Sequence, residues 1–131
     1  MENTARGYLL EGSPPLKSIN FNNIFLQNIA KVAHSCQWEV CGAATPNKLY
    51  FFKNWSPFPK ETFVISPQDY FKICSNIRFF FHSHCLGGPE PSEPDIEISH
   101  ECGLSSLIYS VPEKKFSFYD PKREKLIYFC L

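Results

Sequence analysis

The first strong pattern in the chain is a run of apolar residues at helical spacing that begins near Asn20. It predicts an amphipathic helix of about four turns, whose apolar stripe covers one face of a sheet. The stripe consists of Phe21, Ile24, Phe25, Ile29, Val32, Ala33 and Cys36. Residues 1–17 carry Pro14 and Pro15 and show little periodicity, so we expect an irregular N-terminal arm there. Residues 18–131 are expected to form a single domain.

Downstream of this helix, the apolar segments are short and are separated by turn residues, which is typical of strands. Residues 38–44 and 49–54 are predicted to form a hairpin around Pro46 and Asn47. A proline-broken loop then leads to a short strand at residues 62–65. Later strands are expected around residues 79–81 and, as a closing meander, at residues 104–111, 115–119 and 126–131.

Two shorter helices are predicted between these strands. The first opens at Ser66, which has the character of an N-cap, and runs through Cys74. The second covers residues 96–102 and ends at Gly103. A sheet with one long N-terminal helix and two shorter helices indicates an α/β (α+β) domain.

Composition and charge narrow the possible functions. The chain has 131 residues, enough for one domain with a core. Its 13 basic residues equal its 13 acidic ones, so it lacks the charge footprint of a protein that binds nucleic acid or an anionic membrane. It shows no signal-peptide layout and no apolar run near 18 residues, so we expect a soluble, cytoplasmic protein.

The six cysteines are scattered singly, without Cys-x-x-Cys pairs. In a chain without an export signal, this pattern predicts reduced and mostly buried thiols rather than disulfides or a structural zinc site.

The candidate chemistry lies between Arg78 and Asp95. Three aromatic residues, 79–81, predict a buried strand that continues into His82, Ser83 and His84. Because side chains alternate along a strand, the two histidines point the same way and Ser83 points opposite. His and carboxylate are common ligands of catalytic zinc, which takes three protein ligands. Asp95 is the natural third ligand.

The segment from Ser92 to Asp95 has a second interpretation. Ser-x-x-Asp with a proline in the first turn is also typical of a helix N-terminus, with Ser92 as N-cap. Ser66 and Asp69 form a similar box without a histidine pair, and there we expect only a cap. The full pattern, His-x-His-x7-Ser-x2-Asp, is much more specific and predicts a metal site.

This pattern resembles the signature of the JAMM (MPN-plus, JAB-domain) zinc metalloproteases, which adds a glutamate upstream. Here the signature is Glu39, His82-Ser83-His84, Ser92 and Asp95. The segments 39–42, 54–57 and 63–67 also follow the order seen in compact bacterial and phage members, and the resemblance covers roughly residues 21–119. It implies a JAMM/MPN fold, a mixed curved β-sheet flanked by the three helices.

The resemblance also implies roles for the site residues. His82, His84 and Asp95 would hold one Zn2+ per chain, and such a centre can bring the pKa of bound water near 7. Glu39 would be the general base, with Glu61 and Glu90 as fallbacks. Ser92 would help hold the developing oxyanion, a role compatible with capping. Many members have proline where Cys85 stands; this thiol is either a switch that replaces water on the metal or a small buried side chain.

The implied function is a zinc-dependent isopeptidase or peptidase that cleaves after the C-terminal glycines of a ubiquitin-like protein, in deconjugation or precursor processing. Its partners would be that substrate and the E1- and E2-like activating and conjugating enzymes of a ubiquitination-like or antiviral conjugation pathway in a bacterial or phage setting. Two alternatives remain open, a phage tail-tip assembly peptidase of the same fold and a non-catalytic MPN scaffold. The chain is too short for the two insertions that eukaryotic deubiquitinases of the family carry.

Overall fold

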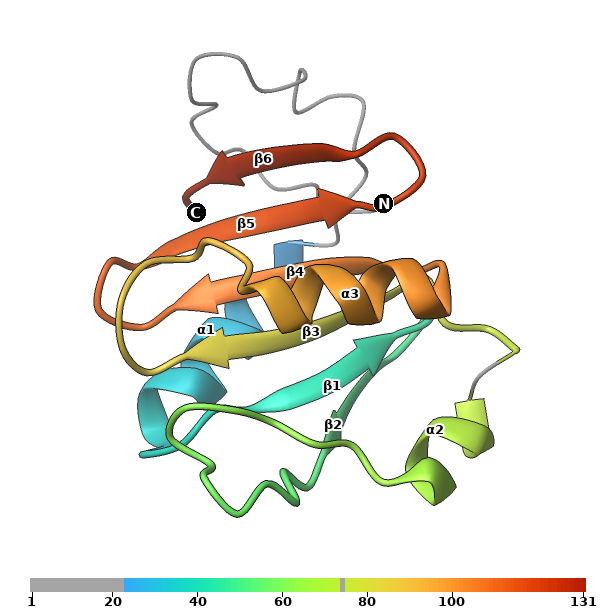
Figure 1. Cartoon of the computed structure of the whole chain (residues 1–131). Helices are drawn as coiled ribbons and strands as arrows, with labels where there is room; N and C mark the ends of the chain where they lie inside the picture. The colour runs from blue at the N-terminus through green and yellow to red at the C-terminus, as the bar shows by residue number, and fades with distance from the viewer. Residues whose placement is uncertain (1–22, 74) are drawn as a thin grey trace.

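One mixed sheet forms the framework of the molecule (Figure 1). The computed structural model describes residues 23–73 and 75–131, and the arm predicted over residues 1–17 lies outside this part of the chain. The strand order is β2-β1-β3-β4-β5-β6, in which β3 and β4 pair in parallel and all other described neighbours pair antiparallel. The strands are β1 Cys41–Ala44, β2 Leu49–Phe52, β3 Phe79–His84, β4 Ser105–Ser110, β5 Lys115–Asp120 and β6 Lys125–Phe129.

Three helices accompany the sheet, α1 Asn23–Ser35, α2 Pro67–Ile73 and α3 Glu93–Cys102. In Figure 1, α1 lies behind the sheet and α3 crosses its front, while α2 sits beside β1 and β2. This confirms the predicted class of a mixed sheet with one longer and two shorter helices. Within the described residues, no helix has the length and apolar character needed to cross a membrane.

The main core lies between α1 and the sheet. Leu26, Ile29 and Ala33 recur along one side of α1, and all three are buried. They pack on strand residues that share the opposite face, namely Val40, Phe81, Leu107, Tyr109, Phe116, Ile127 and Phe129. Burial of such side chains contributes about 1.5–3 kcal/mol each, so this face supplies most of the hydrophobic stabilisation.

The alternation along β3 places the histidines away from this core. Phe81 points toward α1, so Ser83 lies on the same face, and His82 and His84 lie on the face that α3 covers. Because β3 and β4 are parallel, the chain must cross over between them, and α3 is that connection. The crossover brings the first turn of α3 back over the carboxyl end of β3.

One predicted strand is absent. Residues 62–65 belong to an irregular segment, residues 53–66, that runs beside the sheet without joining it. The N–H of Trp55 donates to the carbonyl of Val64 at 2.9 Å, and the N–H of Val64 donates to the Asn54 side chain at 3.1 Å. The prediction is wrong because a side-chain amide, rather than a neighbouring strand, takes up the polar backbone groups of this segment.

Two element boundaries and the burial of the cysteines also differ from the predictions. β1 begins at Cys41 rather than Trp38, because the N–H of Glu39 bonds to the carbonyl of Pro59 in the irregular segment. α3 begins at Glu93, directly after its cap. Among the five described cysteines only Cys41 is buried, since the others lie at the ends of elements, near the surface; these are Cys36, Cys85, Cys102 and Cys130.

Gly42, in the middle of β1, is predicted to be required for the pairing of β1 with β2. A Cβ atom there would lie 1.9 Å from the carbonyl oxygen of Tyr50 and 2.4 Å from the Phe81 ring. Gly42→Ala should therefore lower the free energy of unfolding by about 1–3 kcal/mol, because backbone has to move. Urea denaturation followed by circular dichroism measures this.

Gly88→Ala is the matched control, because its Cβ would meet only carboxylate oxygens at the ends of Glu90 and Glu113. These flexible ends can rotate away. Equal stability losses in the two variants would contradict the role given to Gly42.

Candidate metal centre

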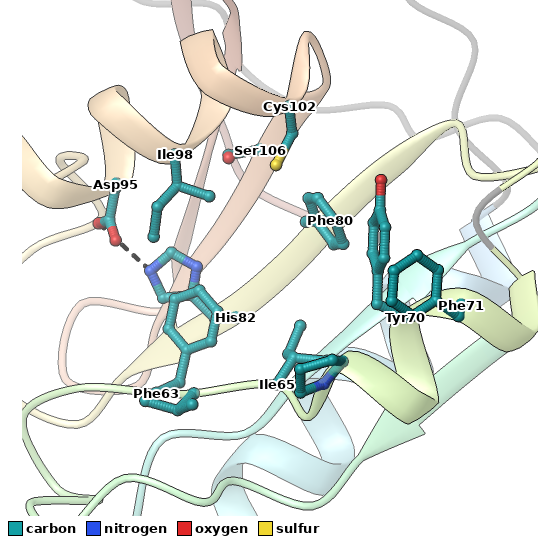
Figure 2. A pocket seen from close by; sticks show the side chains of 12 residues that line it. Phe63, Ile65, Tyr70, Phe71, Phe80, His82, Asp95, Ile98, Cys102 and Ser106 are labelled. Carbon is teal, nitrogen blue, oxygen red and sulfur yellow. Dashed lines mark ion pairs between the residues drawn. The ribbon is translucent and has the colours of Figure 1, made fainter.

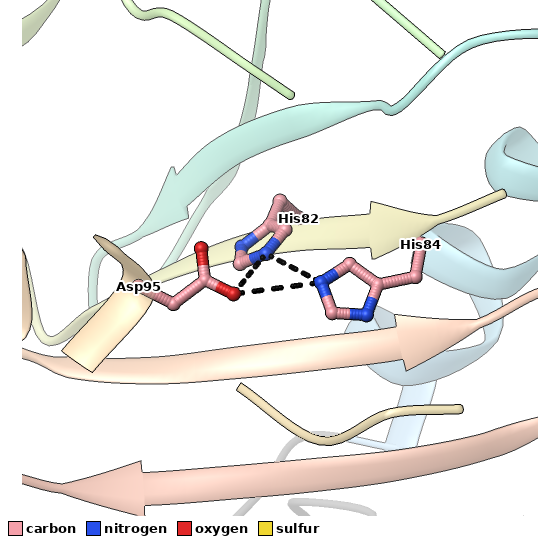
Figure 3. A group of neighbouring side chains, drawn as sticks. All are labelled: His82, His84 and Asp95. Carbon is pink, nitrogen blue, oxygen red and sulfur yellow. Dashed lines mark hydrogen bonds and ion pairs between the residues drawn. The ribbon is translucent and has the colours of Figure 1, made fainter. Parts of the chain in front are cut away.

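Two histidines from β3 and one aspartate from α3 converge on one point (Figure 3). His82 and Asp95 are buried and His84 is half-buried. The Nε2 atoms of His82 and His84 lie 3.2 Å apart, and Oδ2 of Asp95 lies 3.3 Å from the first and 3.5 Å from the second. Among the described residues, these three form the only group that could hold a metal ion.

The spacing of these atoms fits zinc. Ligand atoms placed about 2.0–2.1 Å from a tetrahedral zinc ion are separated from one another by about 3.3–3.4 Å. The three observed separations bracket that value. The donor set, two imidazole nitrogens and one carboxylate oxygen, is also one that zinc accepts. The residues present therefore fit a zinc ion.

The loop after β3 fixes the tautomer of His84. Its Nδ1 atom lies 2.9 Å from the carbonyl oxygen of Gly88. A carbonyl can only accept, so Nδ1 carries a proton, and in the neutral ring the lone pair is on Nε2, which faces the site. Gly87 turns the chain with a φ of 73°, and its carbonyl accepts a hydrogen bond from Ser110 in β4 at 2.7 Å. The loop is thus tied to the sheet.

Asp95 is both a helix-capping residue and a candidate metal ligand. Its N–H donates to Oγ of Ser92 at 3.2 Å, and its Oδ2 accepts from the N–H of Ser92 at 2.8 Å. This is a complete capping box, and it holds the carboxylate with Oδ2 turned toward the histidines. The cap interpretation of Ser-x-x-Asp is confirmed here, and the same carboxylate belongs to the group that could bind a metal ion. At Ser66 and Asp69 only the cap geometry is present.

Glu39 faces the same site from the segment that leads into β1. It is buried and lines a cavity of about 310 Å³ together with His84, Ser92 and Asp95. Burial raises the pKa of its carboxyl group to about 7, with His84 opposing and Asp95 adding to the shift. A carboxyl group that titrates near neutral pH can both accept and return a proton.

The other titratable groups respond to burial and to one another. Burial lowers the pKa of His82, so this ring is neutral. Burial also opposes charge on His84, but the hydrogen bonds to Asp95 and to the Gly88 carbonyl outweigh it and raise the pKa of His84. Burial likewise opposes charge on Asp95, but the bonds from His82 and then His84 hold its pKa well below the ordinary value.

The remaining candidates lie farther from the chemistry. Glu61 lines the same cavity as Glu39, whereas Glu90 does not belong to the described lining of that cavity. Cys85 is half-buried and borders a separate cavity with Cys36. His34 and His100 pair with the hydroxyls of Tyr109 and Tyr119, so neither joins the metal group.

Sequence reasoning assigned no role in the site to Phe63, which stacks on His82 with ring centroids 4.3 Å apart and an interplanar angle of 28°. Phe63 lines the Glu39 cavity and, together with Asp95 and Ile98, also a second, mainly apolar cavity of about 420 Å³ between α2 and α3, drawn in Figure 2. His82 and Asp95 form one end of this second cavity. The role of an aromatic residue in a loop can be recognised only from the folded structure, which places it against His82.

No model of a known protein family matches the chain, and no curated protein matches it. Solved structures share its fold. Protein DSY2949 from Desulfitobacterium hafniense aligns over 79% of this chain and 84% of its own, with a TM-score of 0.59 and 20% identity. AF2198, a JAB1/MPN domain protein from Archaeoglobus fulgidus, aligns over 77% of this chain and 88% of its own, with a TM-score of 0.52 and 22% identity.

These likenesses define the class of protein. The chain has the MPN/JAB-type fold, as its sequence pattern predicted, and it carries a His-His-Asp group that could bind a metal ion.

The variant Asp95→Asn distinguishes the capping role of Asp95 from its role as a candidate metal ligand. The amide oxygen can still accept from the N–H of Ser92, so helix content by circular dichroism should be unchanged, but a neutral amide is a poor zinc ligand. Zinc content by mass spectrometry should fall from about one per chain to near zero. Asp69→Asn makes the same change at a simple cap and should keep its zinc; zinc retained in Asp95→Asn would contradict the assignment.

Zinc affinity should fall as the pH drops from about 8 to about 6. His84 has a raised pKa and must lose its proton to bind metal, while His82 is already neutral. One proton therefore competes, and the affinity should fall by up to about tenfold per pH unit below the pKa of His84. Competition with a chromophoric chelator measures it. A pH-independent affinity, or a hundredfold change per pH unit, would contradict the release of one proton from His84 when the metal binds.

Proposed function

We propose that the protein is a zinc-dependent isopeptidase or peptidase that hydrolyses the amide bond after the C-terminal glycines of a ubiquitin-like protein. The observation that carries the proposal is the position of Glu39. A buried carboxyl group with a pKa near 7 shares a cavity with two candidate metal ligands and with Ser92. A purely structural domain has no need of a buried acid beside a metal group, because burying it costs free energy.

Each residue then has a defined task. His82, His84 and Asp95 would hold the metal, which supplies Lewis acidity and makes hydroxide available near neutral pH. Glu39 accepts the proton of the attacking water and returns it to the leaving amine, as its pKa allows. In the cap, Ser92 Oγ acts only as an acceptor. Its own proton therefore remains available to the carbonyl oxygen as negative charge develops there.

A glycine-rich tail suits this site for steric reasons. His82 and Asp95 are buried, and the Phe63 ring covers His82. We therefore expect the scissile bond to reach them only if the residues beside it have small side chains. Glycine lets backbone approach closely and adopts extended or strained conformations at no steric cost. A ubiquitin-like modifier would supply such a tail, and activating and conjugating enzymes of its pathway would be the natural partners.

Glu39→Gln should abolish cleavage without loss of metal. The amide cannot accept the proton, so kcat should fall by about 10²–10⁴-fold, while zinc content stays near that of the unmodified chain because Glu39 is not a ligand. The assay uses zinc-loaded protein and a panel of modifier proteins fused through a diglycine tail, with cleavage followed by intact-mass spectrometry.

Glu61→Gln is the matched control, since Glu61 lines the same cavity but is exposed. It should retain activity. If the zinc-loaded chain cleaves no diglycine fusion, the proposed substrate is wrong. If it also cleaves no other peptide, the non-catalytic MPN scaffold becomes the better account.

A further inference from the structure

Among the residues that the structure describes, Asn54 makes the most hydrogen bonds through its side chain around the site. It follows β2 at the start of the irregular segment, residues 53–66, and is half-buried. Its Nδ2 atom donates to the carbonyls of Glu39 at 2.9 Å and Thr62 at 3.0 Å, and more weakly to that of Pro59 at 3.4 Å. Its Oδ1 atom accepts from the N–H groups of Ser56 at 3.0 Å and Val64 at 3.1 Å. An amide has two donor hydrogens and two acceptor lone pairs, so this environment uses all four.

The backbone of Glu39 is held mainly through this arrangement. Its carbonyl accepts from Asn54, and its N–H donates to the carbonyl of Pro59 at 2.7 Å. The next N–H, that of Val40, donates to Oγ of Ser83 at 2.9 Å. The carbonyl of Val40 also accepts from the N–H of Ser83 at 2.9 Å, so Val40 is tied to β3. Glu39 precedes the regular part of β1, and the bonds of its own backbone go to the irregular segment.

The same amide also positions the residue that covers His82. Phe63 lies between Thr62 and Val64, whose backbone groups both bond to Asn54. The Phe63 ring stacks on His82. One side chain thus links the segment that carries the stacking ring to the backbone of the buried glutamate.

We propose that Asn54 is a positioning residue that fixes the Glu39 carboxylate relative to the metal ligands. Its effect on turnover rests on the proposed function, whereas its effect on the backbone does not. Asn54 touches no metal ligand, and β3 and α3 hold those ligands independently. Loss of the amide should move Glu39 and Phe63 while leaving the metal group in place.

Asn54→Ala should lower kcat about 100-fold, because a misplacement of about 1 Å in a reacting group has an effect of that size. KM should change much less, and zinc content should stay near that of the unmodified chain. Asn54→Asp keeps the acceptor for Ser56 and Val64 but loses both donors, so it should lose kcat to a similar extent. It also serves as the test variant if Asn54→Ala does not fold.

Ser56→Ala is the matched control in the same segment. The Ser56 hydroxyl pairs with that of Thr62 and accepts from the N–H of Phe58, but it makes no bond to Glu39. This variant should keep a kcat within about threefold of the unmodified chain if the link to Glu39, rather than general order in the segment, sets the rate.

Amide hydrogen exchange provides a readout that does not need a substrate. On the zinc-loaded protein, Asn54→Ala should speed exchange at the N–H groups of Glu39 and Val64, but not in β3 and β4. If the unmodified chain cleaves nothing, the proposed function fails and exchange alone decides this inference. Unchanged exchange at Glu39, or kcat within about threefold of the unmodified chain in an Asn54→Ala variant of an active enzyme, overturns it.

Discussion

The parallel pairing of β3 with β4 is the constraint on which the site depends. Parallel neighbours require a crossover, and here the crossover is α3. The helix therefore returns over the carboxyl end of β3, where His82 and His84 stand on the face opposite the main core. Asp95, in its first turn, meets the histidines at 3.3 and 3.5 Å. An antiparallel hairpin at this point would have left no helix to deliver the third ligand.

The capping box then fixes the orientation of the Asp95 side chain relative to the two histidines. Ser92 and Asp95 exchange hydrogen bonds, which fixes both the start of α3 and the direction of the Asp95 carboxylate. The Gly88 carbonyl does the same for the ring of His84. Ligands held by the backbone in this way lose little conformational entropy on binding a metal ion, because their rotamers are already set.

The proposed base is held differently from the candidate metal ligands. His82, His84 and Asp95 stand on regular elements, whereas Glu39 precedes the regular part of β1 and leans on the irregular segment through Pro59 and Asn54. Burial raises its pKa to about 7, and residues 60–63 of that segment line the cavity beside it. A loop rather than a strand therefore forms part of the surroundings that set the protonation state of this acid.

Local rules determined most of the elements and the candidate ligands. Helical spacing indicated α1, and alternation along β3 put both histidines on one side. The motif spacing named Asp95 and, by resemblance, Glu39 and Ser92. Only the tertiary structure decided how the residues 53–66 fold, because their backbone groups are satisfied by Asn54 instead of by a strand, which apolar alternation cannot reveal. It likewise decided that Phe63 covers His82 and that the capped Asp95 meets both histidines, since these contacts join segments distant in sequence.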